Sequence, residues 1–131
     1  MSQDDRYTIR RLTDSEDGAA KHGLSAMGEA RFPNEDLETK QTGLSHHRIR
    51  AGARQPFGHR HENAEEVYVV LSGSGRVKLD DEIANIGPLD AIRVAPAVAR
   101  AFEGGPEGLE LLAFGPLSPG DGELLPEWWT G

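Results

Sequence analysis

Two histidines and a glutamate near the middle of the chain have the residue types and the spacing of a metal site. His59 and His61 are two positions apart, so on an extended strand their side chains project from the same face. Four residues rich in turn formers and charge follow, and a second predicted strand begins with Glu66. Two imidazoles and one carboxylate from adjoining strands supply three ligands and leave coordination positions open. This set suits divalent iron, manganese, nickel, copper or zinc.

Residues near these strands are candidates for a substrate-binding wall. Tyr68 shares a strand face with Glu66, and Phe57 or Phe102 would supply apolar walls. A small concave site with convergent polar groups is the usual ligand-binding arrangement at the mouth of a β-barrel. We therefore expect a small-molecule ligand to bind there.

A second histidine pair lies on a strand predicted over 42–51. His46 and His47 are adjacent, so they lie on opposite faces of that strand, and at most one of them points inward. His47 is included among the substrate-binding candidates. The alternative interpretation is a hydrogen-bonded wall or surface histidine, which is common on barrel strands.

Composition limits the class of protein and its partners. A chain of 131 residues is one ordinary domain, and 14 basic against 22 acidic residues give a net charge of −8. Such a surface repels nucleic-acid phosphates and anionic membranes, so neither is expected as a partner. With no cysteine, the chain has no disulfide or thiolate chemistry. The start lacks the apolar core of a signal peptide and no run approaches a membrane span, so we expect a cytoplasmic protein.

The spacing of turn formers predicts an all-β fold. Sixteen glycines and eight prolines separate short β-type runs, which is typical of a sandwich or barrel. One helical turn is expected over 33–37, and tight turns are expected over 72–75 and 104–108. The predicted strands cover 7–12, 30–32, 42–51, 66–71, 76–79, 83–86, 91–95, 100–103 and 109–114.

The central run resembles the first conserved motif of the cupin superfamily. That motif is glycine, five residues, His-x-His, three or four residues, glutamate, six residues and glycine. His59, His61, Glu66 and Gly73 fit it, whereas the leading glycine is one position off. Glu65 also fits the looser spacing, but only Glu66 has six residues before Gly73.

The resemblance implies a double-stranded β-helix, the jelly-roll barrel of the cupins, for a single domain over 1–131. Its motif-supported core covers about 45–115, with N-terminal strands within 7–50 and a C-terminal tail over 116–131. Cupins commonly dimerise by exchanging terminal strands, so the resemblance implies a homodimer. Trp128 and Trp129 carry too much apolar surface to be left exposed to water. We expect them to cap the barrel or a second subunit, the alternative being a lid over the pocket.

The second cupin motif is substituted throughout in this chain. In its register the fourth metal ligand of the family, a histidine, is replaced by Arg100. A guanidinium has no lone pair for a metal, but it holds carboxylates or phosphates in a bidentate way. The resemblance therefore implies either a weakened three-ligand metal site or a former metal site that now binds an anion. The alternative is that Arg100 is a strand residue facing water.

Two functional hypotheses follow. The first is a metal-dependent enzyme of oxygenase, isomerase or decarboxylase type, acting on a small anionic or sugar-like compound that Arg100 clamps. The second is a metal-free ligand-binding or sensor module that uses the same pocket without catalysis. The fold alone does not name a substrate, because it supports many chemistries.

Overall fold

The protein is a curled antiparallel β-structure with only one-turn helices, as the computed structural model of residues 6–129 shows. No helix in this described part of the chain is long and apolar enough to cross a membrane. The strands are β1 (Gly28–Arg31), β2 (Thr42–Ile49), β3 (Gly58–His61), β4 (Glu66–Leu79), β5 (Glu82–Ile86), β6 (Ala91–Val94), β7 (Arg100–Pro116) and β8 (Gly122–Leu125). The helical turns are η1 (Leu12–Asp14), α1 (Gly18–Lys21) and α2 (Asn34–Leu37).

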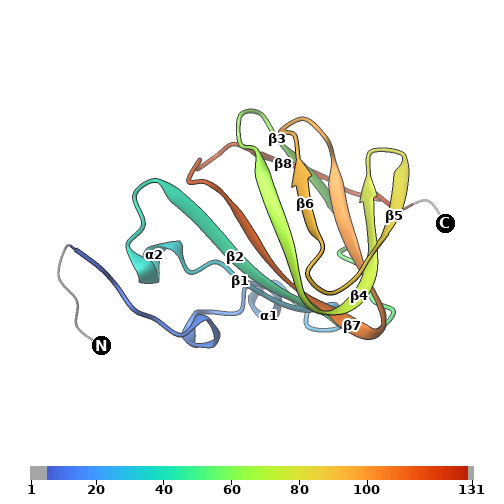
Figure 1. Cartoon of the computed structure of the whole chain (residues 1–131), viewed down its shortest axis with the longest axis horizontal. Coiled ribbons are helices and arrows are strands. Elements are labelled where there is room, and N and C mark those ends of the chain that lie inside the picture. The colour runs from blue at the N-terminus through green and yellow to red at the C-terminus, as the bar shows by residue number, and fades with distance from the viewer. Residues whose placement is uncertain (1–5, 130–131) are drawn as a thin grey trace.

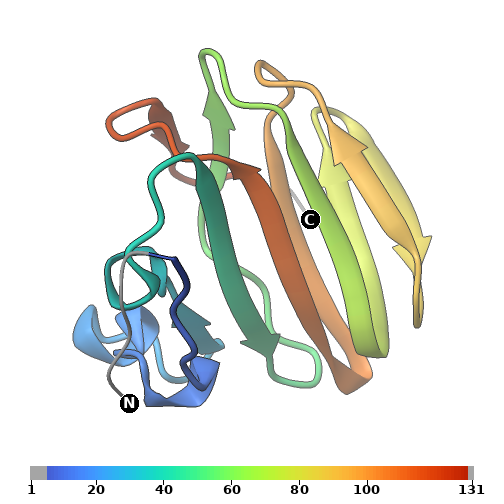
Figure 2. The same cartoon turned by 60° about the vertical axis from the view of Figure 1, so that its left-hand side comes forward.

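Two long strands, β4 and β7, organise the fold. They pair antiparallel over most of their length, from Val67 opposite Phe114 to Leu79 opposite Arg100. One layer has the order β1-β2-β7-β4-β6 and uses the C-terminal half of β7 with the N-terminal half of β4. The other has the order β8-β3-β7-β4-β5 and uses their remaining halves (Figures 1 and 2). The predicted double-stranded β-helix is confirmed.

The glycine runs predicted to be tight turns are instead bends within continuous strands. The register of β4 against β7 shifts between Val70 and Ser72 and again between Gly73 and Gly75. Gly73 has a φ of 76°, and Gly75 lies opposite Gly104. The two runs were wrongly predicted to reverse the chain because each one was interpreted without its partner. Paired with each other, they let both strands bend together from one layer into the next.

Apolar side chains of the two layers meet in one core. Its fully buried members include Val70, Val77, Phe102 and Leu111, and the rings of Tyr68 and Phe102 lie 4.7 Å apart. Val70 and Leu111 alternate along their strands with more exposed residues, as the pleat requires. Val77 and Phe102, which pair between β4 and β7, each have one buried neighbour instead, Lys78 and Ala101.

The C-terminal tail is part of the barrel. β8 pairs with β3, and the Trp128 ring packs against Gly58 so closely that a Cβ there would collide with it. Lys78 is only 8% exposed, and its ammonium donates to the Trp128 carbonyl at 2.6 Å and lies over the indole ring. The Trp129 indole N–H donates to the Gln55 carbonyl at 2.8 Å. The tryptophans thus cap the barrel of their own chain.

The predicted N-terminal strand over 7–12 is wrong. Residues 7–11 form no strand, and Leu12–Asp14 is a 3-10 turn. The outer edge of β1, the edge available to such a strand, is bridged by Asp17 opposite Arg31 and contacted by α1. The homodimer that the resemblance implies stays a prediction.

Replacing Gly73 by alanine should destabilise the fold, because φ is positive there and a Cβ would collide with the Gly108 carbonyl oxygen. We expect the free energy of unfolding to fall by more than about 2 kcal/mol. The matched control is Gly87→Ala, in the turn after β5, where an added Cβ meets no atom within 4 Å. Urea denaturation followed by circular dichroism measures both variants. Equal stabilities for the two would show that the bend does not depend on Gly73.

Candidate metal centre

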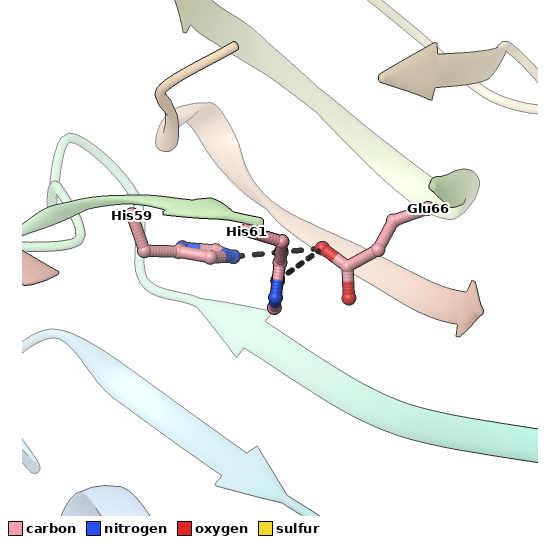
Figure 3. Close-up of side chains that lie close together, drawn as sticks. All are labelled: His59, His61 and Glu66. Atoms are coloured by element: carbon pink, nitrogen blue, oxygen red, sulfur yellow. Dashed lines mark ion pairs between the residues drawn. The ribbon is translucent and has the colours of Figure 1, made fainter. Parts of the chain in front are cut away.

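Three potential metal ligands converge on one point between the layers. His59 Nε2 lies 3.6 Å from Glu66 Oε1, and His61 Nε2 lies 3.2 Å from the same oxygen (Figure 3). One ligand atom from each residue lies within 4.8 Å of the other two. Tetrahedral ligands at about 2.0–2.1 Å from a metal are about 3.3 Å from each other, so this spacing fits a metal ion.

The three residues come from opposite layers rather than from adjoining strands. β3, which carries both histidines, pairs with β7 and β8, whereas Glu66 begins β4 in the layer with β6. The imidazoles lie perpendicular to each other, with centroids 5.4 Å apart, and both point toward the carboxylate (Figure 3). The prediction that these three side chains converge is confirmed. The prediction that their strands adjoin is wrong, because residue spacing does not show which strands pair.

Glu66 is anionic at neutral pH. Burial acts to raise its pKa, but hydrogen bonds from His59 and Tyr68, with the charges of His61 and His59, outweigh burial and lower the pKa to about 2. The Tyr68 hydroxyl donates to Glu66 Oε1 at 2.7 Å. Burial is the largest cause, and the Glu66 charge the next, of a pKa for Tyr68 well above its usual 10. Tyr68 therefore keeps this proton.

Arg100 faces the site from within the barrel and not from the surface. It is fully buried, and its backbone lies opposite His59 in the β3–β7 pairing. One terminal nitrogen donates to the His59 and Pro96 carbonyls, each at 3.4 Å, and the other lies 3.7 Å from Glu66 Oε1. The guanidinium therefore neutralises part of the Glu66 charge. A divalent ion must compete with it, which weakens metal binding without removing any of the three donors.

A carboxylate that was not predicted from the sequence, Asp121, holds the loop between His61 and Glu66. Asp121 accepts the backbone N–H groups of residues 62–64 at 2.8 to 2.9 Å, and its Oδ2 lies 3.5 Å from His61 Nδ1. It lies about 60 positions away, in a tail whose composition indicates a linker, so no local signal marks it. A carboxylate against the outer nitrogen of a ligating histidine directs the other nitrogen to the metal.

The three ligands line one end of a cavity of about 560 Å³. Tyr68, His47 and Phe57, expected from the sequence to contact a ligand, also line this cavity. Two other candidates do not: Phe102 is buried in the core against Tyr68, and Arg100 lies behind Glu66.

His47 projects from β2 into the cavity and is neutral at pH 7. Its Nε2 lies 2.9 Å from the Ser45 hydroxyl, and its buried Nδ1 has no hydrogen-bond partner among the described residues. Burial, followed by the charges of His59 and His46, lowers the pKa of His47 to about 4, although Glu66 acts to raise it. His46 lies on the other face, where its Nε2 is 2.7 Å from Glu110.

Substitution of Asp121 by alanine should weaken metal binding, because it removes the carboxylate that lies 3.5 Å from His61 Nδ1. We expect the metal dissociation constant to rise by about 10- to 100-fold. In the zinc-loaded protein the ¹⁵N NMR spectrum should show the His61 proton on Nδ1, and this signal should shift or broaden in the variant. Asp81→Ala, at the exposed turn before β5, is the control and should change neither measurement. A variant that binds zinc as tightly as the parent protein would show that Asp121 only shapes the loop.

The metal-free protein should lose stability as the pH falls from about 6.5 to about 4. Because the folded-state pKa of His47 lies below its unfolded value of 6.5, the unfolded state binds the extra proton in this window. The loss from this one residue is roughly 2 to 3 kcal/mol. Urea denaturation at several pH values should show that His47→Gln removes this part of the loss, whereas His22→Gln, on the exposed surface, does not. Parallel profiles for the parent chain and His47→Gln would contradict the assignment.

Known structures with the same architecture were found, although no protein-family model and no curated protein matches the sequence. A cupin protein from Bacteroides fragilis is 22% identical with a TM-score of 0.70, over 88% of this chain and 87% of that chain. The polyketide cyclase RemF from Streptomyces resistomycificus is 20% identical with a TM-score of 0.70, over 94% and 87%. A single-substitution variant of oxalate decarboxylase from B. subtilis is 21% identical with a TM-score of 0.71, over 92% of this chain and 34% of that chain. The chain therefore has the fold of a small cupin.

Proposed function

We propose that the chain is a small-molecule-binding cupin that holds a divalent transition metal on His59, His61 and Glu66. The observation that carries this proposal is the convergence of three donor atoms within 4.8 Å at one end of a cavity. Iron, manganese, nickel, copper and zinc all accept such a ligand set. When bound, the metal would supply Lewis-acid or oxygen-activating chemistry to a ligand in the cavity.

An enzymatic role of oxygenase, isomerase or decarboxylase type is supported by the groups around the ligands. The Tyr68 hydroxyl lies between Glu66 and His59, at 2.7 and 3.3 Å, and it keeps its proton, so it fixes the orientation of both ligands. His47 is a neutral imidazole on the same cavity, suited to accept or donate a proton. Proteins of similar fold include a polyketide cyclase, an oxalate decarboxylase and a DMSP lyase, which supports an enzyme for this architecture without naming the reaction.

Arg100 was expected to clamp an anionic substrate. In the structure the Arg100 guanidinium is fully buried and lies 3.7 Å from Glu66 Oε1, outside the cavity lining. Its charge acts on the ligand carboxylate instead. The proposed ligand is therefore a small molecule whose binding does not depend on Arg100.

The second candidate is a ligand-binding or sensor module that works without a metal. The observation that favours it is the ion pair between Arg100 and Glu66, because Arg100 already gives the Glu66 carboxylate a positive partner without a metal. Tyr68 and both histidines would then form the polar end of a binding pocket. The two candidates differ in metal content and share the cavity.

Elemental analysis of protein purified without chelator or affinity tag separates the two. We expect about one equivalent of transition metal, and Glu66→Gln should raise the metal dissociation constant at least about tenfold because it removes the only charged ligand. Glu65→Gln is the matched control, since the neighbouring Glu65 is exposed and pairs with Arg93 at 3.3 Å. Less than about a tenth of an equivalent, with none taken up on titration, would overturn the metal proposal and favour the binding module.

A further inference from the structure

We infer that the cavity takes a compound with an apolar, ring-sized body and an oxygen at one end. This inference rests on the proposed function, because the oxygen end is placed at the metal ligands. It goes further by naming the chemical class of the ligand, and it replaces the anionic or sugar-like compound expected from the sequence.

Apolar side chains form most of the wall, and they come from both layers of the barrel. They belong to the segments before and after β1, to β2, to the segment before β3, and to β8. The largest are Leu24, Met27, Phe32, Leu44, Phe57 and Leu124. A body enclosed between these segments would be covered from two sides, and a volume of about 560 Å³ suits a small molecule.

Several of these apolar side chains are exposed to solvent. Phe32 is 60% exposed, Leu124 is 65% exposed and Phe57 is 39% exposed, although all three line the cavity. Covering clustered apolar surface is favourable, so an apolar ligand gains affinity there that a polar one does not.

Three polar side chains on the apolar part of the wall have their oxygens engaged within the protein. The side-chain oxygens of Asn34 and Gln55 each accept a backbone N–H, at 2.9 and 3.1 Å. Both oxygens of Glu123 accept from Arg60 at 3.1 Å. The several hydroxyls of a sugar would lose their water here without gaining equivalent partners, which is costly.

Free polar capacity is concentrated at the metal end. His47 lines the cavity from β2, close enough to His59 and Glu66 for their charges to act on it, and its buried Nδ1 has no partner among the described residues. A neutral imidazole suits a hydroxyl or carbonyl better than a formal charge. One oxygen of the ligand can therefore lie at the metal site beside His47, while the rest of the ligand contacts apolar side chains.

The test is titration of zinc-loaded protein with 1-naphthol, naphthalene and D-glucose, followed by calorimetry or by naphthol fluorescence. We expect 1-naphthol to bind at least about tenfold more tightly than D-glucose, because only naphthol buries apolar surface. Naphthalene should bind more weakly than 1-naphthol, and His47→Leu should reduce that difference because the variant loses the imidazole partner.

A matched pair of variants localises the binding. Phe57→Ser should weaken 1-naphthol binding about tenfold, whereas Phe114→Ser should leave it unchanged. The two phenylalanines are equally exposed, at 39% and 38%, but only Phe57 lines the cavity.

Zinc content, measured on the same samples, separates the two possible failures. Zinc uptake with no binding of 1-naphthol up to about 1 mM, or with tighter binding of D-glucose, overturns this inference and leaves the proposed metal site intact. Equal effects of the two phenylalanine variants overturn the placement in this cavity. Binding of 1-naphthol without zinc uptake overturns the proposed metal site, and with it the position assigned to the oxygen end.

Discussion

One carboxylate oxygen, Oε1 of Glu66, is the point on which the site depends. The Tyr68 hydroxyl donates to it, both imidazoles of β3 approach it, and the Arg100 guanidinium lies behind it. These groups come from both layers, so the carboxylate links the two layers electrostatically. An ion placed among the imidazoles takes over part of the role that Arg100 has in its absence. The presence of Arg100 beside Glu66 would therefore set a competition between metal and guanidinium.

The backbone determines where this carboxylate lies. Because β4 and β7 bend together at their paired glycines, the start of β4 lies in one layer and the histidine-bearing β3 lies in the other. The tail then fastens the loop between them, since Asp121 binds the backbone of residues 62–64 and β8 pairs with β3. The site is thus assembled from segments far apart in the sequence, and its geometry depends on tertiary pairing more than on the motif itself.

Local spacing was sufficient to predict the cluster of three potential metal ligands and the fold class. The two-residue step from His59 to His61 and the interval from Glu66 to Gly73 carry that information in one short run. The predictions that were wrong concerned residues whose contacts lie far away in the sequence. The glycines at 72–75 look like a turn until their pairing with 104–108 is known, and the burial of Arg100 follows from its position between β3 and β4. Asp121 has no sequence signal, because its role is defined by backbone groups about 60 residues away.

The most direct test of the account is a crystal structure of the protein grown with zinc and measured at the zinc absorption edge. The account predicts one anomalous peak about 2.0–2.2 Å from Nε2 of His59, Nε2 of His61 and a carboxylate oxygen of Glu66. No peak at this position, with Glu66 still paired to Arg100, would contradict it.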